Sequence, residues 1–257
     1  MLPPFFNIYN YVICNRLRIL MYHRIADDSP DRLTISPKLF QQEMEYLAAN
    51  GFHVISLQEA RERLAANADL KKQIALTFDD GYLDFLTNAA PILRQLKFSA
   101  TLFIVTGAIG SHAHWSSVDK RQRLLDKEQL LELRAQGFQL GSHTVTHPDL
   151  TAQSDSQLAD ELKRSRDAVC ALGEMFVPFA YPGGSFTRRE RDAVERARYD
   201  CAVIVGGRWG NGRETDRFLL KREPMLASDS LAWFKKRVNG YYEGHYLWAR
   251  ARRMKTR

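Results

Sequence analysis

The chain has 257 residues, of which 45% are hydrophobic and 26% are charged, and its formal net charge is +7. This composition is typical of a folded globular protein and excludes an intrinsically disordered chain. No apolar run approaches the roughly 20 residues that a membrane-spanning helix needs.

The two ends of the chain have unusual compositions. Residues 1–17 are rich in aromatic side chains but lack the basic start and the small-residue cleavage site of a signal peptide. We expect them to form a packing or surface arm, with an uncleaved interfacial anchor as the alternative. Residues 241–257 are strongly basic, which suits a solvated terminus or contact with an anionic membrane surface. No nucleic-acid-binding motif accompanies this charge, so we expect no nucleic-acid partner.

Helix start and stop signals recur along the chain. Ser36 precedes Pro37, apolar residues follow at helical spacing, and Gly51 ends the segment. Two further helices are predicted over residues 126–137 and about 230–238. Capping boxes, in which Ser or Thr is followed three residues later by Glu or Gln, begin at Ser56, Ser154 and Thr187.

Short apolar runs rich in β-branched residues lie between these helices and predict strands. The candidate strands are residues 19–22, 53–56, 74–78, 100–105, 138–142, 176–180, 201–205 and 218–221. About eight strands alternating with about seven helices predict a parallel sheet that closes, or nearly closes, into a β/α barrel. We expect a single domain over residues 1–257, with the barrel at 18–240 between the N-terminal arm and the basic tail of 241–257.

Catalytic side chains of such barrels follow the carboxyl ends of the strands. Five ionisable residues stand just after predicted strands: His23, Asp79, Asp80, His143 and His147. Because the carboxyl ends of parallel strands meet at one face, we expect these side chains to lie close together.

Asp79 and Asp80 are followed by Gly81. Neighbours within a strand point to opposite faces, but a turn at Gly81 would let both carboxylates face one site. Two close carboxylates repel each other unless a cation or a proton separates them. A metal ion bound by one Asp, with the other acting as a base towards water, would resolve this repulsion. A plain surface turn is the alternative interpretation.

His143 and His147 are separated by three residues. Pro148 and the β-branched residues between them favour a loop over a helix, and either geometry allows both imidazoles to bind one ion. Two imidazoles and one carboxylate leave a coordination position for water, as a catalytic metal site requires. The alternative is a pair of solvated histidines. The Asp pair that we expect on the same face makes this alternative less favoured.

Tyr181-Pro-Gly-Gly184 follows another predicted strand. Glycine there can bring backbone N–H groups close to a substrate, so Gly183 is a candidate oxyanion donor, with a simple tight turn as the alternative. The rings of Trp115 and Tyr181 could stack on a pyranose or could be packing residues.

Three of these segments resemble the motifs of a known family. Residues 77–81 (Thr-Phe-Asp-Asp-Gly), 142–147 (Ser-His-Thr-Val-Thr-His) and 181–184 are similar, in order and spacing, to the first three motifs of the polysaccharide deacetylases (carbohydrate esterase family 4, the NodB-homology domain). The resemblance covers roughly residues 18–225. It implies a distorted (β/α)7-8 barrel that removes N-acetyl, sometimes O-acetyl, groups from sugars with zinc or another divalent metal ion.

The resemblance also implies a role for each matching residue. Asp79 corresponds to the general base. The backbone N–H of Gly183 corresponds to an oxyanion donor, with Tyr181 beside the substrate. The metal ligands correspond to Asp80, His143 and His147.

Two positions depart from the common pattern of the family. Many members carry an Arg two residues before the Pro of the third motif, where it holds the base; here that position is Ala180, and Arg222 is the candidate to supply the guanidinium. Many members also end with a Leu-x-His motif whose His is the general acid, and no such motif follows Arg222. Residues 20–25 (Leu-Met-Tyr-His-Arg-Ile) resemble a subgroup that begins with Tyr-His-x-Ile, which implies His23 as the acid.

The resemblance therefore implies a metal-dependent hydrolase acting on an N-acetylated sugar, polysaccharide or lipid-linked saccharide. The same barrel serves amidases and deformylases with non-polymeric substrates, and a catalytically silent glycan-binding protein is a third interpretation. Because the start of the chain does not resemble a signal peptide, we expect a cytoplasmic enzyme in peripheral contact with the inner membrane, with an exported form as the alternative. An odd number of widely spaced cysteines argues against a disulfide framework.

Overall fold

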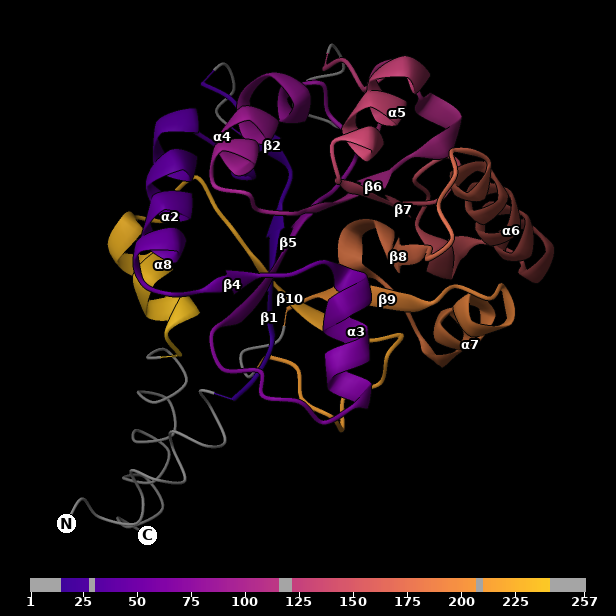
Figure 1. The fold of residues 1–257 in the computed structure, drawn as a ribbon. Helices are drawn as coiled ribbons and strands as arrows, with labels where there is room; N and C mark the ends of the chain where they lie inside the picture. Colours follow the sequence, from indigo (N-terminus) through magenta and orange to yellow (C-terminus); the bar gives the residue numbers. More distant parts are fainter. Residues whose placement is uncertain (1–14, 28–30, 116–121, 207–209, 241–257) are drawn as a thin grey trace, which may run out of the picture.

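The computed structural model describes residues 15–27, 31–115, 122–206 and 210–240. Parallel strands form a closed barrel at its centre, with helices around the outside (Figure 1). The barrel strands are β1 (Arg18–Tyr22), β5 (Gln73–Phe78), β6 (Thr101–Ile104), β7 (Gln139–Ser142), β8 (Pro178–Ala180), β9 (Cys201–Val205) and β10 (Leu220–Pro224).

The barrel closes through β1, which pairs with β10 on one side and with β5 on the other. Tyr22 at the end of β1 is level with Phe78 at the end of β5, so both strands finish at the same rim. A further strand, β4 (His53–Val54), pairs with the start of β5 outside the closed ring. The predicted β/α barrel is confirmed, and each of the predicted strands is present within a few residues of its expected ends.

The predicted helices are present where their capping signals place them. Their bounds are α2 (Pro37–Ala49), α3 (Leu57–Ala65), α5 (Lys127–Ala135), α6 (Asp155–Ala171), α7 (Arg188–Arg196) and α8 (Leu231–Val238). Reciprocal capping boxes begin at Asp126, Ser154 and Thr187. At the start of α3, the Ser56 side chain accepts a hydrogen bond from the backbone N–H of Glu59. The Glu59 carboxylate pairs with Arg63 at 2.8 Å instead of returning to the backbone of Ser56. The described residues also contain the 3-10 turns η2 (Thr106–Ala108), η3 (Leu150–Ala152) and η4 (Pro182–Gly184).

Two features have no clear signal in the sequence. A π-helix, η1 (Phe85–Ala89), runs directly into α4 (Ala90–Gln95). Pro91 lies in the first turn of α4, directly after the π-helix. A short strand, β2 (Arg24–Ile25), follows β1 and pairs in parallel with a second short strand, β3 (Thr34–Ile35).

The predicted terminal segments are only partly covered by the structure. Residues 1–14 of the predicted arm and all of the predicted basic tail, 241–257, lie outside the described residues. Leu17 is buried, and its backbone exchanges hydrogen bonds of 3.0 and 2.8 Å with Asn211. Within the described ranges, no helix combines the length and hydrophobicity needed to cross a membrane.

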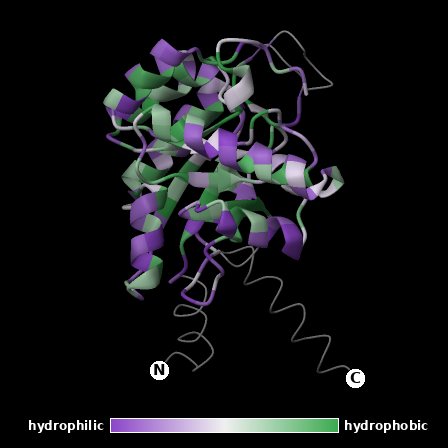
Figure 2. Ribbon diagram, turned by 90° about the vertical axis from the view of Figure 1, so that its right-hand side faces the viewer, coloured by the Kyte–Doolittle hydropathy of each residue, from purple (hydrophilic) through white to green (hydrophobic). Residues whose placement is uncertain are grey.

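Hydrophobic residues concentrate on the strands and on the inward helix faces, while hydrophilic residues cover the outer helix faces (Figure 2). A cluster of small and medium side chains from alternate strand positions, with the Phe103 ring among them, fills the inside of the barrel. Gly141 on β7 leaves room for this ring, because a Cβ there would lie 2.6 Å from Cδ1 of Phe103 and 3.0 Å from Cγ of Pro178. The interior of the barrel is therefore tightly packed around Phe103.

We predict that Gly141→Ala destabilises the protein by about 1–3 kcal/mol, because one extra methyl group must displace Phe103 in a filled interior. Urea unfolding monitored by circular dichroism measures the change. Ser156→Ala on the exposed start of α6 is the control, with an expected change within about 0.5 kcal/mol. Wild-type stability of Gly141→Ala would contradict the tight packing.

Candidate active site and metal centre

The strand order brings the predicted residues to one end of the barrel. β1 lies beside β5, and the backbone N–H of Asp79 donates to the carbonyl oxygen of Tyr22 at 3.0 Å. β6 lies between β5 and β7, and the backbone N–H of His143 donates to the carbonyl oxygen of Ile104 at 2.9 Å. The carboxyl-terminal rim therefore carries the residues that follow β1, β5 and β7, which are His23, Asp79, Asp80, His143 and His147.

A left-handed turn after β5 lets two adjacent carboxylates enter the same site. Asp80 has a φ of 73° and Gly81 a φ of 78°. Asp tolerates this conformation better than most residues, and Gly adopts it freely. A Cβ on Gly81 would also lie 3.2 Å from Cγ2 of Ile104. The turn expected from Gly81 is present, and both Asp79 and Asp80 are buried.

Arg222 on β10 binds Asp79 inside the barrel. Its Nη1 donates to Oδ1 at 2.6 Å and its Nη2 to Oδ2 at 2.7 Å, a bidentate pair with both side chains buried. Burial alone would raise the pKa of the Asp79 carboxyl, but the Arg222 charge and hydrogen bonds, aided by His143 and His23, hold that pKa well below its ordinary value. Asp79 is therefore an ionised carboxylate with a fixed orientation.

Asp80, His143 and His147 form a buried group that could hold a metal ion. Oδ1 of Asp80 lies 3.6 Å from Nε2 of His143 and 3.5 Å from Nε2 of His147. Ligand atoms about 2.1 Å from an ion in a tetrahedral site lie about 3.4 Å apart, so these separations suit a shared ion better than direct hydrogen bonds. Among the described residues, Oδ1 of Asp80 is buried without a hydrogen-bond partner.

The protonation states of these three groups also suit a cation. Burial lowers the pKa of His143 to about 3 and that of His147 to about 4, so both imidazoles are neutral near pH 7. Burial raises the pKa of Asp80 to about 6, with opposition from His23 and reinforcement from the negative charge of Asp79. Neutral imidazole nitrogens and a carboxylate oxygen without a hydrogen-bond partner are the donor set of a catalytic metal site.

Neighbouring groups orient the two histidines. The carbonyl oxygen of Ala180 lies 2.8 Å from Nδ1 of His143, so a proton on Nδ1 leaves Nε2 as the free ligand atom. The Trp115 indole stacks on His147, with centroids 4.9 Å apart and planes at 16°. Glu161 on α6 accepts from the backbone N–H groups of Val145 and Thr146, at 2.7 and 3.1 Å, and thereby holds the loop between the two histidines.

His23 directly follows β1, at the rim that carries the two carboxylates. Electrostatic interaction with His23 contributes to lowering the pKa values of Asp79 and Asp80, which agrees with its place near the site. Within the described part of the chain, the buried Nδ1 of His23 has no hydrogen-bond partner.

The two candidate residues of the third motif differ in exposure. Gly183 lies in the turn η4 with a φ of 61° and is exposed at the end of β8. The Tyr181 ring, expected beside the substrate, is buried, packs against Phe179 and Phe186, and its hydroxyl donates to the carbonyl oxygen of Phe218 at 3.2 Å. A sugar cannot stack on a ring enclosed in this way, so the structure favours the packing alternative for the Tyr181 ring.

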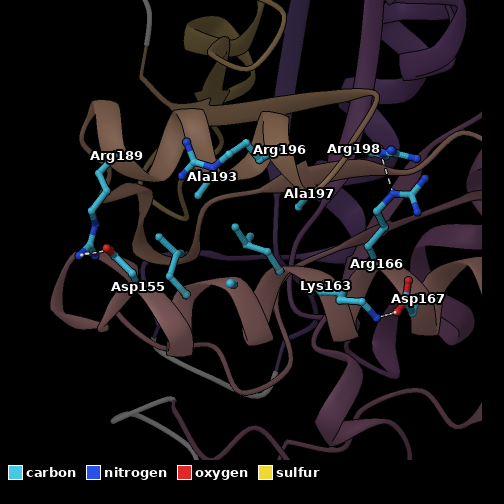
Figure 3. A pocket seen from close by; sticks show the side chains of 12 residues that line it. Asp155, Lys163, Arg166, Asp167, Arg189, Ala193, Arg196, Ala197 and Arg198 are labelled. Atoms are coloured by element: carbon cyan, nitrogen blue, oxygen red, sulfur yellow. Dashed lines mark hydrogen bonds and ion pairs between the residues drawn. The ribbon is translucent and has the colours of Figure 1, made fainter.

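A hollow of about 630 Å³ between α6 and α7 lies apart from this site (Figure 3). Its charged side chains mostly interact among themselves, since Arg189 pairs with Asp155 at 3.4 Å and Lys163 with Asp167 at 2.8 Å. None of the five rim residues described above lines it. The catalytic chemistry expected of this chain therefore does not lie in this hollow.

Sequence reasoning did not single out Glu161 or the contact between Trp115 and His147. The Glu161 carboxylate reaches a loop 15 residues earlier in the chain, so no short motif contains both partners. The sequence indicated Trp115 only as a ring that could stack on a sugar or pack, without His147 as its partner. The role of the Glu161 carboxylate is visible only in the folded protein, where α6 lies beside the loop whose N–H groups it accepts.

Comparisons with known proteins agree with the geometry of the site. Residues 66–202 match the sequence profile of the family described as polysaccharide deacetylase. The Bacillus subtilis (strain 168) protein YxkH, named as a polysaccharide deacetylase, is 29% identical over 192 residues, covering 74% of this chain and 64% of YxkH. The chain thus spans less than two thirds of that relative's length. A poly-beta-1,6-N-acetyl-D-glucosamine N-deacetylase of Staphylococcus aureus (strain MRSA252) is 24% identical over 239 residues, 89% of this chain and 80% of the relative.

Solved structures are similar as well. The deacetylase PplD of Streptococcus pyogenes, solved in complex with acetate, is 28% identical and superposes with a TM-score of 0.75 over 87% of this chain and 98% of PplD. Because the family profile matches more than half of the chain and the barrel of the structure agrees with it, this protein belongs to the polysaccharide deacetylase family.

Proposed function

We propose that this protein hydrolyses the N-acetyl group of an N-acetylated sugar, as a free saccharide, a polymer or a lipid-linked precursor, with one divalent metal ion, zinc, as cofactor. The observation that carries the proposal is the buried Asp80 oxygen without a partner, set between two neutral imidazoles beside an ionised carboxylate. The names of the relatives from Staphylococcus aureus and Streptococcus pyogenes support a deacetylase.

Asp79 acts as the general base in this proposal. The Arg222 pair keeps it ionised and aimed, so that it contributes chiefly a fixed acceptor for the proton of the attacking water. A carboxylate with so low a pKa is a weak base, and its value therefore lies in its placement. Asp80, His143 and His147 would hold the ion.

A bound divalent ion supplies Lewis-acid chemistry, because it lowers the pKa of a water molecule and polarises a carbonyl group. The other steps belong to residues of the chain. The backbone N–H of Gly183 stabilises the developing oxyanion, which costs no reorganisation when the donor is already fixed. His23 protonates the amine nitrogen as the C–N bond breaks.

Acetate release from N-acetylated glucosamine oligomers, with and without a strong chelator, tests the function. We expect activity, its loss with chelator, and its recovery when a divalent metal is added back. Activity only on non-sugar amides or formyl compounds would instead support an amidase or a deformylase. Glycan binding without acetate release at any metal concentration would support a catalytically silent protein.

We predict that Asp79→Asn and His143→Ala abolish activity for different reasons. Asp79→Asn removes the proton acceptor and should lower acetate release by about 10²–10⁴-fold while one metal ion per chain stays bound. His143→Ala removes a ligand and should lose the metal itself. Elemental analysis and acetate assays measure both, with the exposed His53→Ala as control. Near-wild-type activity of Asp79→Asn would contradict its role as the base.

We predict that Arg222→Met destabilises the protein by about 3–5 kcal/mol at pH 7, because it leaves the Asp79 charge buried without a partner. The pKa of Asp79 is lower in the folded protein than in the unfolded chain. The ion pair therefore stabilises the folded state at pH values above the ordinary pKa of Asp, and this stabilisation is lost as the pH falls below that value. The cost of Arg222→Met should therefore shrink below about pH 4.

Urea titrations at several pH values measure this cost. Arg164→Met is the matched control, because Arg164 pairs with Asp160 at 3.0 Å on the exposed face of α6 and should contribute only about 0–1 kcal/mol. Equal costs for the two variants, or a cost that grows in acid, would show that Arg222 does not stabilise the Asp79 charge.

A further inference from the structure

The loop that carries His23 is fastened to the π-helix η1 through two side chains. Oδ2 of Asp84, the residue before η1, accepts from Nε of Arg24 at 2.8 Å, and Oδ1 accepts from the backbone N–H of Ile25 at 3.1 Å. Asn88 within η1 donates from Nδ2 to the carbonyl oxygen of Ile25 at 2.6 Å. The backbone N–H and the carbonyl oxygen of Ile25, two residues after His23, are thus both bound by side chains of Asp84 and Asn88.

The other side of His23 is fastened to the barrel. The carbonyl oxygen of Tyr22 accepts from the backbone N–H of Asp79 at 3.0 Å, and the buried Tyr22 hydroxyl donates to Glu43 at 2.8 Å. His23 therefore lies at the rim of the site between two anchored neighbours. Because its buried Nδ1 has no partner among the described residues, its place depends on these anchors more than on a hydrogen bond of its own ring.

The Arg24–Asp84 pair is buried, with side chains 6% and 11% exposed. Removing two charges from water offsets much of their attraction, so such a pair is weak support for stability and better explained as a device that fixes geometry. The Arg24 guanidinium also lies over the Tyr82 ring, 5.8 Å from its centroid, and Tyr82 hydrogen-bonds Asp80. The same contacts thus link the loop of His23 to the carboxylate of the candidate metal site.

The helix that provides these anchors has the wider turn of a π-helix over Phe85–Ala89. Single π-turns are rare overall, and those that occur are often found at functional sites. Here Asp84 and Asn88 both reach the peptide groups of Ile25.

We infer that Asp84 and Asn88 are positioning residues for His23, and that their contacts to Arg24 and Ile25 hold the imidazole where it can protonate the leaving amine. This inference rests on the proposed deacetylase function. In the step concerned, water gives its hydroxyl to the acetyl carbon and a proton to Asp79. The C–N bond breaks, and the amine nitrogen takes its proton from His23, so that acetate and a free amine result.

The test uses the difference between two leaving groups. An amine must be protonated as it leaves, whereas the 4-nitrophenolate of 4-nitrophenyl acetate leaves without a proton, so general-acid catalysis matters only for the amide. Acetate release from an N-acetylated glucosamine oligomer and hydrolysis of 4-nitrophenyl acetate are measured for metal-loaded wild type and variants. Metal content and melting temperature are recorded for each protein.

We predict that Asp84→Asn lowers kcat for the amide about 10–100-fold, as a misplaced catalytic group does, and changes ester hydrolysis by less than about 2-fold. Asn88→Ala removes one hydrogen bond and leaves the Arg24–Asp84 pair intact, so it should show the same selective loss to a smaller degree. It also serves as the second variant where Asp84→Asn folds poorly. Asp160→Asn on the exposed face of α6 is the matched control, and neither reaction should change.

His23→Ala separates this inference from the proposed function. If His23→Ala shows the selective loss on the amide but Asp84→Asn and Asn88→Ala do not, the positioning inference is wrong and the general acid stands. If His23→Ala itself slows both substrates equally, the acid assignment fails. Equal slowing of both substrates by Asp84→Asn and Asn88→Ala at unchanged metal content would mean a merely structural role.

Discussion

The bidentate contact between Arg222 and Asp79 is the interaction on which the rest of the site depends. Two adjacent carboxylates end the same strand, and without a further charge their mutual repulsion would favour protonation of one of them. Arg222 gives the first carboxylate a partner inside the barrel at 2.6 and 2.7 Å. Asp80 is left with a buried oxygen that has no partner in the described chain. One Asp is thereby assigned to a guanidinium and the other to the imidazoles.

The barrel makes this division possible because β10 and β5 flank the same strand, β1. Arg222 is level with Ile19, and Ala75 is level with Ile19 on the other side, so the Arg222 side chain extends along the barrel towards the rim to meet Asp79. Its guanidinium passes over the Phe103 ring at 5.4 Å, and Phe103 in turn needs the empty space at Gly141. The tight interior and the charged pair are therefore parts of one packing arrangement.

Carboxylates outside the site hold both loops that carry its histidines. Glu161 accepts two backbone N–H groups of the loop between His143 and His147, and Asp84 accepts one from the loop after His23. Loops have many conformations, and each such contact removes some of them before a substrate arrives. The site thus depends on helices α6 and η1 as well as on the strand ends.

Much of this arrangement could be predicted from the sequence, and the limits have physical reasons. Strand periodicity, capping boxes and the rule that chemistry follows strand ends placed His23, Asp79, Asp80, His143 and His147 on one rim. Assigning Asp79 and His23 their roles needed the family resemblance.

The features that sequence reasoning missed are those set by tertiary contact. The η1 helix follows no periodic signal, and the Glu161 contact joins segments that only folding brings together. The sequence left two interpretations of the Tyr181 ring open, because a motif shows which residue is present and not which way its ring turns; here the ring turns into the core.

A crystal structure of the metal-loaded protein, with the ion located by its anomalous scattering, tests the central claim most directly. The account predicts one ion bound by Asp80, His143 and His147 at about 2.0–2.2 Å, with Asp79 still paired to Arg222. An ion that draws Asp79 away from Arg222 into its coordination shell, or that binds elsewhere in the chain, would contradict the division of the two carboxylates.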